Sequence, residues 1–276
     1  LYNLDLKNPR LKFYEIDLRK PFIEWPNIEG LKTIFHLAAN ADVRGGINNR
    51  DIDFDQNVVV TKSICDYASK YSVEHLVFSS SATVYGEPSV FPTSEINLSQ
   101  QTSVYGASKL FGEAYIQAYS EYGDFRSTIF RFVSWIGYGY SHGVIYDFYK
   151  KLNINNRSLK ILGDGKQKKS FLDVKDGIKG ILSLINHEEK SATFNLGHHE
   201  IMSVNELAKI VCDYLDLKNI EFKYTGTKRG WIGDSPLVHL DISKAKSFGW
   251  KPEVSIRQGI KNTLDYLTND KKNIYR

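Results

Sequence analysis

Two hydrophobic patterns alternate along the first half of the chain. Nearly continuous apolar runs occupy LKTIFHLAA (31–39), EHLVFSSS (74–81) and RSTIFRFVS (126–134), which is typical of strands covered on both faces. The segments between them, 57–71 and 103–122, are expected to be helices, and the first carries apolar side chains at the i, i+3, i+4, i+7 spacing. Strands that alternate with helices in this way predict right-handed βαβ units and a doubly wound parallel sheet, an α/β fold.

The pattern is more mixed in the second half. The loop GYGYSHG (137–143) is expected to mark a boundary, after which a smaller lobe covers the first. Ser203 and Glu206 have the spacing of a capping box, so a helix is expected to start there. The other expected elements are a helix over 143–152, a strand, a turn and a strand over 159–174, a helix to about residue 186, a short strand over 193–197 and a final helix within 241–276.

Small or polar residues stand at the end of each predicted strand of the first half. They are Ala38-Ala39-Asn40, Ser79-Ser80-Ser81 and Ser134. Ligands of doubly wound sheets bind beyond the carboxyl ends of the strands. These residues are therefore expected to line one crevice.

One part of a nucleotide-binding domain is missing from the pattern. Such a domain normally opens with a strand, a glycine-rich turn and a helix whose N-terminus holds a pyrophosphate. Residues 1–30 contain no such turn, and the chain starts on a loop that leads to a predicted strand, LKFYEIDL (11–18). We expect residues 1–276 alone to bind a dinucleotide poorly and to expose a sheet edge.

The composition is that of an ordinary globular protein, with 42% hydrophobic and 25% charged residues. The net charge of +4 is mild and dispersed, which argues against nucleic acid as a partner but suits a small phosphate-bearing substrate. No apolar run approaches the roughly 18 residues of a membrane span. Cys65 and Cys212 both lie in predicted helices, so two packed thiols in a cytoplasmic setting are expected rather than a disulfide. His198 and His199 would point to opposite faces of a strand, and no metal site is expected.

The stretch SVYGASK (103–109) places Tyr105 four residues before Lys109, on one face of the predicted helix. A phenol titrates near ~10, so it needs a nearby cation to act as a base. The spacing alone is equally compatible with a partly buried aromatic residue beside a solvated surface charge. The surrounding motifs decide between the two interpretations.

Nine segments in order along the chain resemble one family, the extended short-chain dehydrogenase/reductases, and within it the nucleotide-sugar epimerases of the UDP-glucose 4-epimerase type. Each segment is weak by itself, whereas the ordered set covers nearly the whole chain. The segments are YEIDL (14–18), HLAANADV (36–43), Asn57, FSSSATVYG (78–86), YGASK (105–109), RFVSWIG (131–137), GDGKQKKSFLDVKD (163–176), FNLG (194–197) and RGWIGD (229–234).

The resemblance implies a Rossmann-like domain and a smaller α+β substrate-binding lobe. Residues 1–136 would form the NAD-binding domain, to which 168–190 would return, and 137–276 would form mainly the substrate-binding lobe. The family's GxxGxxG turn and the acidic residue after its second strand would lie before Leu1, so the Rossmann-like domain is expected to be N-terminally incomplete. About forty to fifty residues, one βαβ opening, would restore them.

The resemblance also implies a reaction and its catalytic residues. An epimerase of this type oxidises C4 of a nucleotide sugar to a ketone with NAD and then returns the hydride to the other face. Tyr105 matches the base, Lys109 its electrostatic activator and a ligand of the nicotinamide ribose, and Ser81 the serine or threonine that bonds the 4-oxygen. Sugar 4,6-dehydratases of this family carry an Asp-Glu pair where this chain has Ala82 and Thr83, which argues against dehydration.

Further residues are carried over from the family motifs to the cofactor and the substrate. For the cofactor they are Asp17, Leu18, Ala38, Ala39, Asn57, Ser79, Tyr105, Lys109 and Phe132. For a UDP-sugar they are Ser81, Thr83, Ser134, Val144, Lys169, Arg229 and Asp234. The family holds the diphosphate with an asparagine and two arginines, where this chain has Ser134, Lys169 and Trp231, with Arg229 nearby. Lysine lacks the bidentate fork of arginine, so the nucleotide assignment is the softer part.

Several alternatives stay open at this point. The substrate is expected to be a UDP-hexose or a UDP-N-acetylhexosamine. A nucleotide-sugar reductase or 4,6-dehydratase would use the same tyrosine and lysine, and a non-catalytic family member would use neither. Family members often form homodimers through the helices that correspond to 57–71 and 103–122, and the same association is expected here.

Overall fold

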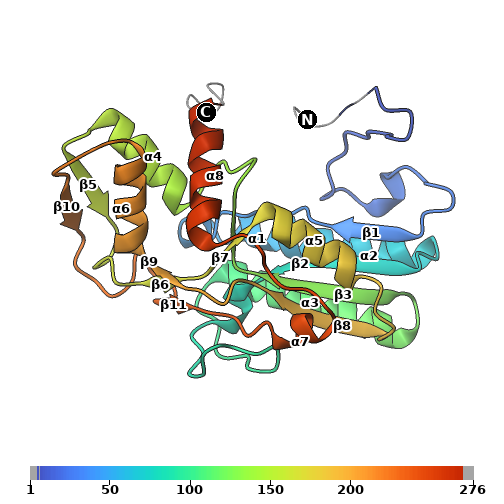
Figure 1. Cartoon of the computed structure of the whole chain (residues 1–276). Coiled ribbons are helices and arrows are strands. Elements are labelled where there is room, and N and C mark those ends of the chain that lie inside the picture. The colour runs from blue at the N-terminus through green and yellow to red at the C-terminus, as the bar shows by residue number, and fades with distance from the viewer. Residues whose placement is uncertain (1–4, 6, 270–276) are drawn as a thin grey trace.

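A four-stranded parallel sheet forms the centre of the computed structural model, which describes residue 5 and residues 7–269 (Figure 1). Its strands are β1 (Thr33–His36), β2 (His75–Ser81), β3 (Arg126–Phe132) and β8 (Ser191–Leu196), in the order β1-β2-β3-β8. Every neighbouring pair is parallel. The predicted α/β fold with a parallel sheet is confirmed.

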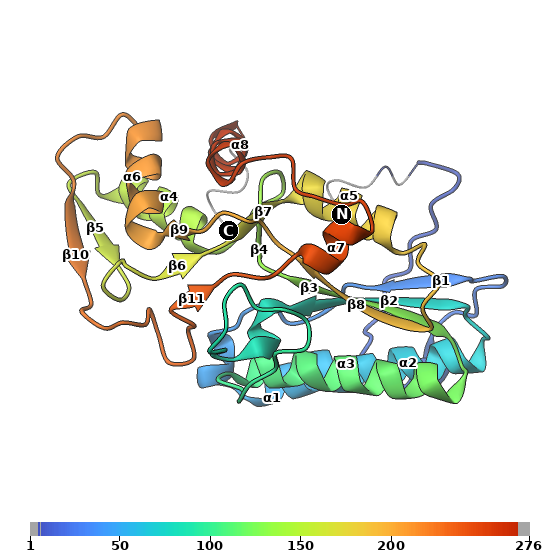
Figure 2. The ribbon, with the colours of Figure 1, turned by 60° about the horizontal axis from the view of Figure 1, so that its bottom comes forward.

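Helices cover both faces of this sheet. The helices α2 (Val60–Lys70) and α3 (Val104–Tyr122) lie side by side on one face, and α5 (Val174–Leu184) and α7 (Ser243–Ser247) lie on the other (Figure 2). Because both faces are covered, Leu76, Val77 and Phe78 in β2 are at most 1% exposed. This explains the unbroken apolar run in the sequence of that strand.

A second lobe stands beside the sheet, with its own apolar core. The helices α4 (Val144–Ile154), α6 (Val204–Tyr214) and α8 (Ile256–Asn269) pack around Leu152, Val211 and Ile260. Three small sheets complete it and join it to the first: β5 (Ser158–Ile161) with β10 (Glu221–Tyr224), β4 (Ser134–Ile136) with β7 (Phe171–Asp173), and β6 (Lys168–Lys169) with β9 (Met202–Ser203) and β11 (Leu237–Val238).

Short helical segments shape the loops at the carboxyl edge of the sheet. They are the 3-10 turns η2 (Gly45–Ile47) and η4 (Ala82–Tyr85) and the single turn α1 (Asp51–Asp53), whereas the 3-10 turn η1 (Phe22–Glu24) precedes β1 and packs against α2. Between α1 and α2 the helix widens into a π-helix, η3 (Phe54–Val59). A single π turn inside a helix often accompanies a functional site, because the extra residue changes the direction in which a side chain points.

Local sequence signals account for several boundaries. Ser203 caps α6, and Glu206 bonds back to the Ser203 amide, so the predicted capping box is confirmed. The helix α3 ends at Gly123, whose φ of 93° is in the left-handed region that glycine adopts at little cost. Cys65 and Cys212 are both buried free thiols, as expected.

The predicted strand at 11–18 is wrong. Among the described residues β1 pairs on one side with β2, and no strand lies on its other side. A strand needs a hydrogen-bonding neighbour, and residues 11–18 have none, so they form an irregular segment. Leu18 instead packs against the core that contains Trp25 and Tyr67.

Two further findings concern metals and membranes. His198 and His199 do not point to opposite faces, because β8 ends at Leu196 and their rings stack with centroids 4.3 Å apart. Together with Glu200 they form a group of three residues that could offer metal ligands, but His198 Nδ1 accepts a 3.0 Å hydrogen bond from the Glu200 amide. Within the described part of the chain, no helix has the length and apolar character to span a membrane.

Candidate active site

The carboxyl ends of β1 and β2 form the floor of the site. The two strands are parallel, with Phe78 opposite His36, so the residues that follow them lie together. The Ser79 hydroxyl donates to the His36 carbonyl at 3.2 Å across the two strand ends. Ser81 is the last residue of β2, and the chain leaves the sheet after it. Two of the three strand ends that were predicted to line one crevice, those of β1 and β2, therefore lie side by side.

The N-terminus of α3 brings Tyr105 to this edge. Ser103 caps the helix by accepting a 3.0 Å hydrogen bond from the Gly106 amide, which places Tyr105 in the first turn. Gly106 allows the close approach, since a Cβ atom there would lie 2.7 Å from the Thr83 carbonyl oxygen. The glycine of YGASK is therefore required by the contact between α3 and η4.

Tyr105, Ser81 and Thr83 form a chain of hydroxyl groups. Ser81 Oγ accepts hydrogen bonds from the Thr83 amide at 3.2 Å and from Thr83 Oγ1 at 3.0 Å. Burial raises the pKa of Tyr105 to about 12, the hydrogen bond to Ser81 lowers it, and the charge of Asp53 raises it. The phenol is therefore protonated in the ligand-free protein at neutral pH.

Lys109 lies one turn further along α3 and is only 3% exposed. Its ammonium donates a 2.8 Å hydrogen bond to the Ser79 carbonyl and lies 4.9 Å from the centre of the Phe78 ring. Burial lowers the pKa of Lys109 to about 8, against the charges of Glu113 and Asp53, which raise it. Direct activation of Tyr105 by Lys109 stays a prediction, since the groups that shift the pKa of the phenol here are burial, Ser81 and Asp53.

Asn57 braces the tyrosine helix from the π-helix η3. Its Oδ1 accepts from the Asn40 amide at 2.8 Å, and its Nδ2 donates to Ser108 Oγ at 2.9 Å. Ser108 Oγ in turn donates to the Tyr105 carbonyl at 2.8 Å. The side chain of Asn57 therefore joins the loop after β1 to the first turn of α3.

Asp53 is a site residue that the sequence did not reveal. It is fully buried, and its Oδ1 accepts hydrogen bonds from Asn40 Nδ2 at 2.8 Å and from Asn57 Nδ2 at 3.3 Å. Its Oδ2 has no hydrogen-bond partner among the described residues. Its position four residues before Asn57 was the available signal, because that spacing puts both side chains on one helix face.

The residues at this edge fit a ligand that carries hydroxyl groups. The buried Lys109 ammonium uses one of its three donors in a hydrogen bond to the described chain, and Asp53 Oδ2 is a buried acceptor without a partner. Ala38 and Ala39 follow β1 with small side chains, which leave its backbone open to close approach. The ammonium of Lys109 as a donor and the carboxylate of Asp53 as an acceptor are compatible with the hydroxyl groups of a nicotinamide ribose.

Phe132 borders the same edge from β3. It pairs with Ser81 in the sheet register and is half-buried. Its ring packs edge-on against Trp135 with centroids 4.6 Å apart and stacks with Phe130 at 6.1 Å. It forms an apolar wall beside the hydroxyl chain, the position at which a planar ring could lie.

Three of the expected substrate residues, Lys169, Asp234 and Arg229, take part in two ion pairs. Lys169 Nζ lies 2.7 Å from Asp234 Oδ1, and Asp234 Oδ2 also accepts from the Gly230 amide at 3.0 Å. Arg229 lies 2.6 Å from Glu87 Oε1, a residue that follows η4 in the first lobe. Both candidate phosphate-binding cations are therefore paired with carboxylates. The Trp231 ring, which replaces the family arginine, lies beneath Arg44 at 5.6 Å.

Four predicted residues are not brought into contact with this cluster. Asp17 is exposed and bound to Arg19 at 2.6 Å, which together with its backbone bond to Arg19 lowers the pKa of Asp17 to about 2. Leu18 lies in the core, Ser134 is exposed at the start of β4, and Val144 is the first residue of α4. No hydrogen bond or ion pair among the described side chains links these four to Tyr105 or Lys109. Their assignments stay predictions.

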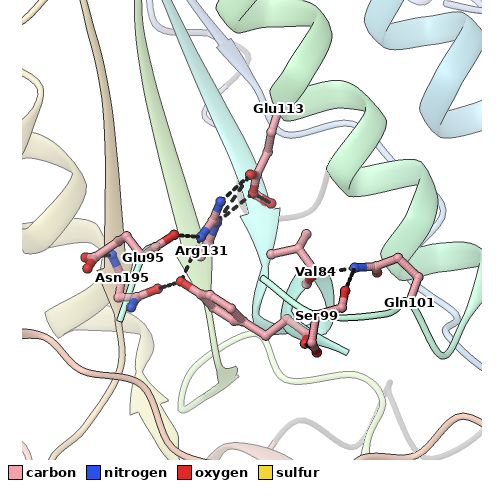
Figure 3. Close-up of polar contacts among 9 residues, drawn as sticks. Val84, Glu95, Ser99, Gln101, Glu113, Arg131 and Asn195 are labelled. Atoms are coloured by element: carbon pink, nitrogen blue, oxygen red, sulfur yellow. Dashed lines mark hydrogen bonds and ion pairs between the residues drawn. The ribbon is translucent and has the colours of Figure 1, made fainter. Parts of the chain in front are cut away.

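A buried ion pair behind the site was also missed. Arg131 on β3 and Glu113 on α3 form it, 18 residues apart in sequence (Figure 3). Glu113 lies four residues after Lys109, so the helical spacing already put the two on one face. The partner on β3 could not be foreseen from local pattern.

Known proteins share this arrangement of motifs and fold. Residues 3–197 match the model of the NAD dependent epimerase/dehydratase family. A protein of Methanocaldococcus jannaschii, provisionally named a UDP-glucose 4-epimerase, is 34% identical over 271 residues, which cover 96% of this chain and 87% of that protein. A crystal structure of UDP-galactose 4-epimerase has a TM-score of 0.83 and 31% identity, with 92% of this chain and 83% of that chain covered. MoeE5, solved with UDP-glucuronic acid and NAD, has a TM-score of 0.78 and 26% identity, with coverages of 86% and 79%.

Proposed function

The chain belongs to the NAD-dependent epimerase/dehydratase family, and on that premise we propose that it is a UDP-sugar 4-epimerase that uses NAD. One observation carries the proposal. The Ser81 hydroxyl bonds the Tyr105 phenol at the carboxyl edge of the sheet, with the Lys109 ammonium one helical turn away. A base, a hydroxyl that can bond the reacting oxygen and a buried cation are the groups that reversible oxidation of an alcohol needs.

The reaction divides among these residues in two reversible halves. Tyr105 Oη accepts the proton of the 4-hydroxyl while the C4–H bond breaks and its electron pair leaves as hydride, so that C4 becomes a ketone. A bound NAD would supply the acceptor for that hydride and the donor that returns it. The ketone oxygen stays hydrogen-bonded to Ser81 Oγ, and after hydride returns to the opposite face, Tyr105 gives back the proton. The product is the 4-epimer, and no net oxidation has occurred.

The pKa of Tyr105 sets a requirement on this scheme. At about 12 in the ligand-free protein, the phenol is a poor base at neutral pH. A cationic nicotinamide and the Lys109 ammonium beside it would favour the phenolate, since opposite charges within about 4–6 Å lower a pKa by roughly 1–3 units. Base function is therefore proposed to appear on cofactor binding.

The absence of a carboxyl group beside Ser81 supports epimerisation over dehydration. Ala82 and Thr83 occupy the next two positions, and Thr83 is engaged with Ser81 through its own hydroxyl. Glu113 on α3 is bound to Arg131, and Asp53, which keeps one carboxylate oxygen without a partner, lies on α1 and not beside Ser81 in the sequence. A dehydratase needs an acid to expel the 6-hydroxyl, and the two positions after Ser81 supply none.

The second lobe is proposed to hold the uridine diphosphate. Lys169 and Arg229 would bind its phosphates, and Asp234, which already orients Lys169, would lie near the ribose. The structurally similar MoeE5, which was solved with UDP-glucuronic acid, supports a UDP-sugar as the substrate class. A UDP-hexose or UDP-N-acetylhexosamine is our proposed substrate. We also propose that residues 1–136 form the NAD-binding lobe, to which 168–190 return, and that 137–276 form mainly the substrate-binding lobe.

Two further proposals concern assembly and location. The outward face of α2 and α3 carries small residues such as Ala107 and Ala114 beside the half-buried, stacked rings of Phe111 and Tyr115. A second copy packed on this face would form a four-helix bundle, and light scattering of the purified protein would give the mass of a dimer. The buried free thiols of Cys65 and Cys212 support a reducing, cytoplasmic location.

The test of the proposed function is interconversion of sugar epimers. Purified protein supplied with NAD would be incubated with UDP-glucose, UDP-glucuronic acid and UDP-N-acetylglucosamine, and the anomeric signals of their 4-epimers followed by NMR. Tyr105→Phe is expected to lower kcat at least about 10³-fold, because it removes the base but retains the ring. Absence of a 4-epimer from all three substrates would overturn the assignment. Consumption of NADH in proportion to product would favour a reductase.

A further inference from the structure

A buried polar network lies directly behind Lys109 and Ser81. The Glu113 carboxylate is 2% exposed in its side chain and accepts two hydrogen bonds from Arg131 Nε, at 3.0 and 3.2 Å, and one from a terminal nitrogen of the guanidinium at 2.7 Å. The Ser80 hydroxyl donates to the same carboxylate. The pair therefore fastens α3 to β2 and β3 at once.

Arg131 continues the network away from the catalytic edge. Its other terminal nitrogen donates to the Tyr85 hydroxyl at 2.9 Å and to the Glu95 carbonyl at 2.6 Å, and its guanidinium lies 4.8 Å from the centre of the Tyr85 ring. Tyr85 donates to Asn195 Oδ1 at 2.5 Å, on β8 (Figure 3). All three nitrogen atoms of the Arg131 guanidinium donate hydrogen bonds, so the position of this side chain is fixed.

Two members of the network, Ser80 and Glu113, adjoin the proposed catalytic groups. Ser80 lies between Ser79, whose carbonyl accepts from Lys109, and Ser81, whose hydroxyl bonds Tyr105. Glu113 lies one turn after Lys109 on the same helix face. A change at Glu113 therefore reaches both the strand end and the lysine.

We propose that Glu113 and Arg131 are a positioning pair for the catalytic centre, in which the bonds fix the end of β2 against α3 and the balance of the two charges determines how firmly Lys109 holds its proton. The inference rests on the function proposed above only for the meaning of Lys109 in turnover. The charge balance itself is a property of the ligand-free chain.

The charged and titratable groups around Lys109 are few. Glu113 follows it on α3, Tyr105 precedes it there, Asp53 faces it from α1, and His36 faces it from β1. His36 is neutral near pH 7, since burial and the Lys109 charge lower its pKa to about 3. The carboxylates of Glu113 and Asp53 therefore raise the pKa of Lys109 against the effect of burial. Of the two, Glu113 forms an ion pair, with Arg131.

The charge part of the proposal makes an ordered prediction. Glu113→Gln keeps the shape but removes the negative charge and leaves Arg131 behind, so the Lys109 ammonium should titrate at lower pH by about 1 unit or more. The double variant E113Q/R131Q removes both charges, so its titration should lie between those of E113Q and the native protein. Tyr85→Phe cuts the network without changing charge and should leave the titration of Lys109 in place.

The experiment follows the side-chain nitrogen of Lys109 by NMR in the full chain without cofactor, with ¹⁵N-labelled lysine and Lys109→Arg to assign the signal. If E113Q alone does not fold, the double variant and Y85F still decide, because the double variant leaves no unpaired buried charge. The proposal is overturned if E113Q titrates like the native protein, or if the double variant shifts as far as E113Q. It is equally overturned if Y85F shifts the titration as much as the double variant.

A second measurement connects the pair to turnover. The high-pH limb of kcat should move down in E113Q and partly return in E113Q/R131Q, because Lys109 must be protonated to favour the phenolate. A merely structural role would lower kcat at all pH values and would leave the pH of this limb unchanged in both variants. If the native protein shows no epimerase activity, the proposed function is refuted. The titration of Lys109 in the ligand-free protein would still test whether Glu113 and Arg131 control its protonation.

Discussion

Two arginine–glutamate pairs of nearly equal length lie in this molecule. Arg131 and Glu113 are 2.7 Å apart, with 5% and 2% of their side chains exposed, whereas Arg229 and Glu87 are 2.6 Å apart and 42% and 38% exposed. The first pair lies between α3 and the sheet, and the second joins the two lobes at the surface. The distance is the same, so the environment decides what each pair can do.

Burial makes the first pair permanent and the second exchangeable. A buried ion that loses its partner is left without either a counter-ion or water, which costs its full desolvation free energy, whereas an exposed ion is solvated by water. Arg131 therefore cannot leave Glu113 for a ligand, which suits the positioning role proposed for it. Arg229 can leave Glu87 at little cost, which suits the diphosphate-binding role proposed for it.

The largest effect should separate the two pairs by stability. Arg131→Met leaves Glu113 buried without a cation, so the free energy of unfolding should fall by about 3–5 kcal/mol. The matched change Arg229→Met should alter it by less than about 1 kcal/mol. Urea denaturation followed by circular dichroism measures both, and similar losses in the two variants would break the comparison.

A second buried ionisable group, His75, should make the stability of the protein depend on pH. His75 in β2 donates or accepts at Thr128 Oγ1, 2.8 Å away, and burial, Arg126 and His187 lower its pKa from 6.5 to about 4. Between these values the unfolded chain binds more protons, so native stability falls as pH drops from about 7 to 4, and His75 contributes on the order of 2 kcal/mol of that loss.

His75→Gln tests this contribution. The variant should lose less stability between pH 7 and pH 4 than the native protein, because glutamine does not titrate in this range. Urea titrations at several pH values give the comparison. A native-like pH dependence in H75Q would mean that His75 is charged in the folded chain.

The carboxyl edge of the sheet was the part of the fold that the sequence predicted best, whereas its catalytic role stays a proposal. Tyr105, Lys109 and Gly106 lie within one helix start, and Ser81 ends the strand before it, so hydrophobic period and motif order sufficed. The parallel sheet and the family assignment are confirmed for the same reason. Each strand, and the start of α3, is encoded by residues close in sequence, and the alternation of strands and helices then implied the parallel sheet.

The errors and omissions came from partners that are distant in sequence. Residues 11–18 have the composition of a strand but no neighbour to pair with, which no local pattern reveals. Glu113 meets Arg131 across 18 positions, and Lys169 meets Asp234 across 65. Arg229 was expected beside phosphate, but its pairing with Glu87 required the lobes to be placed against each other.

The smallest effect concerns Glu87 and tests whether the exposed pair is exchangeable. If Arg229 must leave Glu87 to bind the diphosphate, Glu87→Gln removes a competitor, and KM for the UDP-sugar should fall by about two- to five-fold, the equivalent of a surface ion pair. The same change in an Arg229→Met background should leave KM as it is, because no released cation remains to gain from it. Steady-state kinetics at low and moderate salt would measure the cycle, and the gain should shrink with salt. A rise in KM on E87Q in the native background would show instead that Glu87 holds Arg229 in its binding position, and the two pairs would then differ only in exposure and not in role.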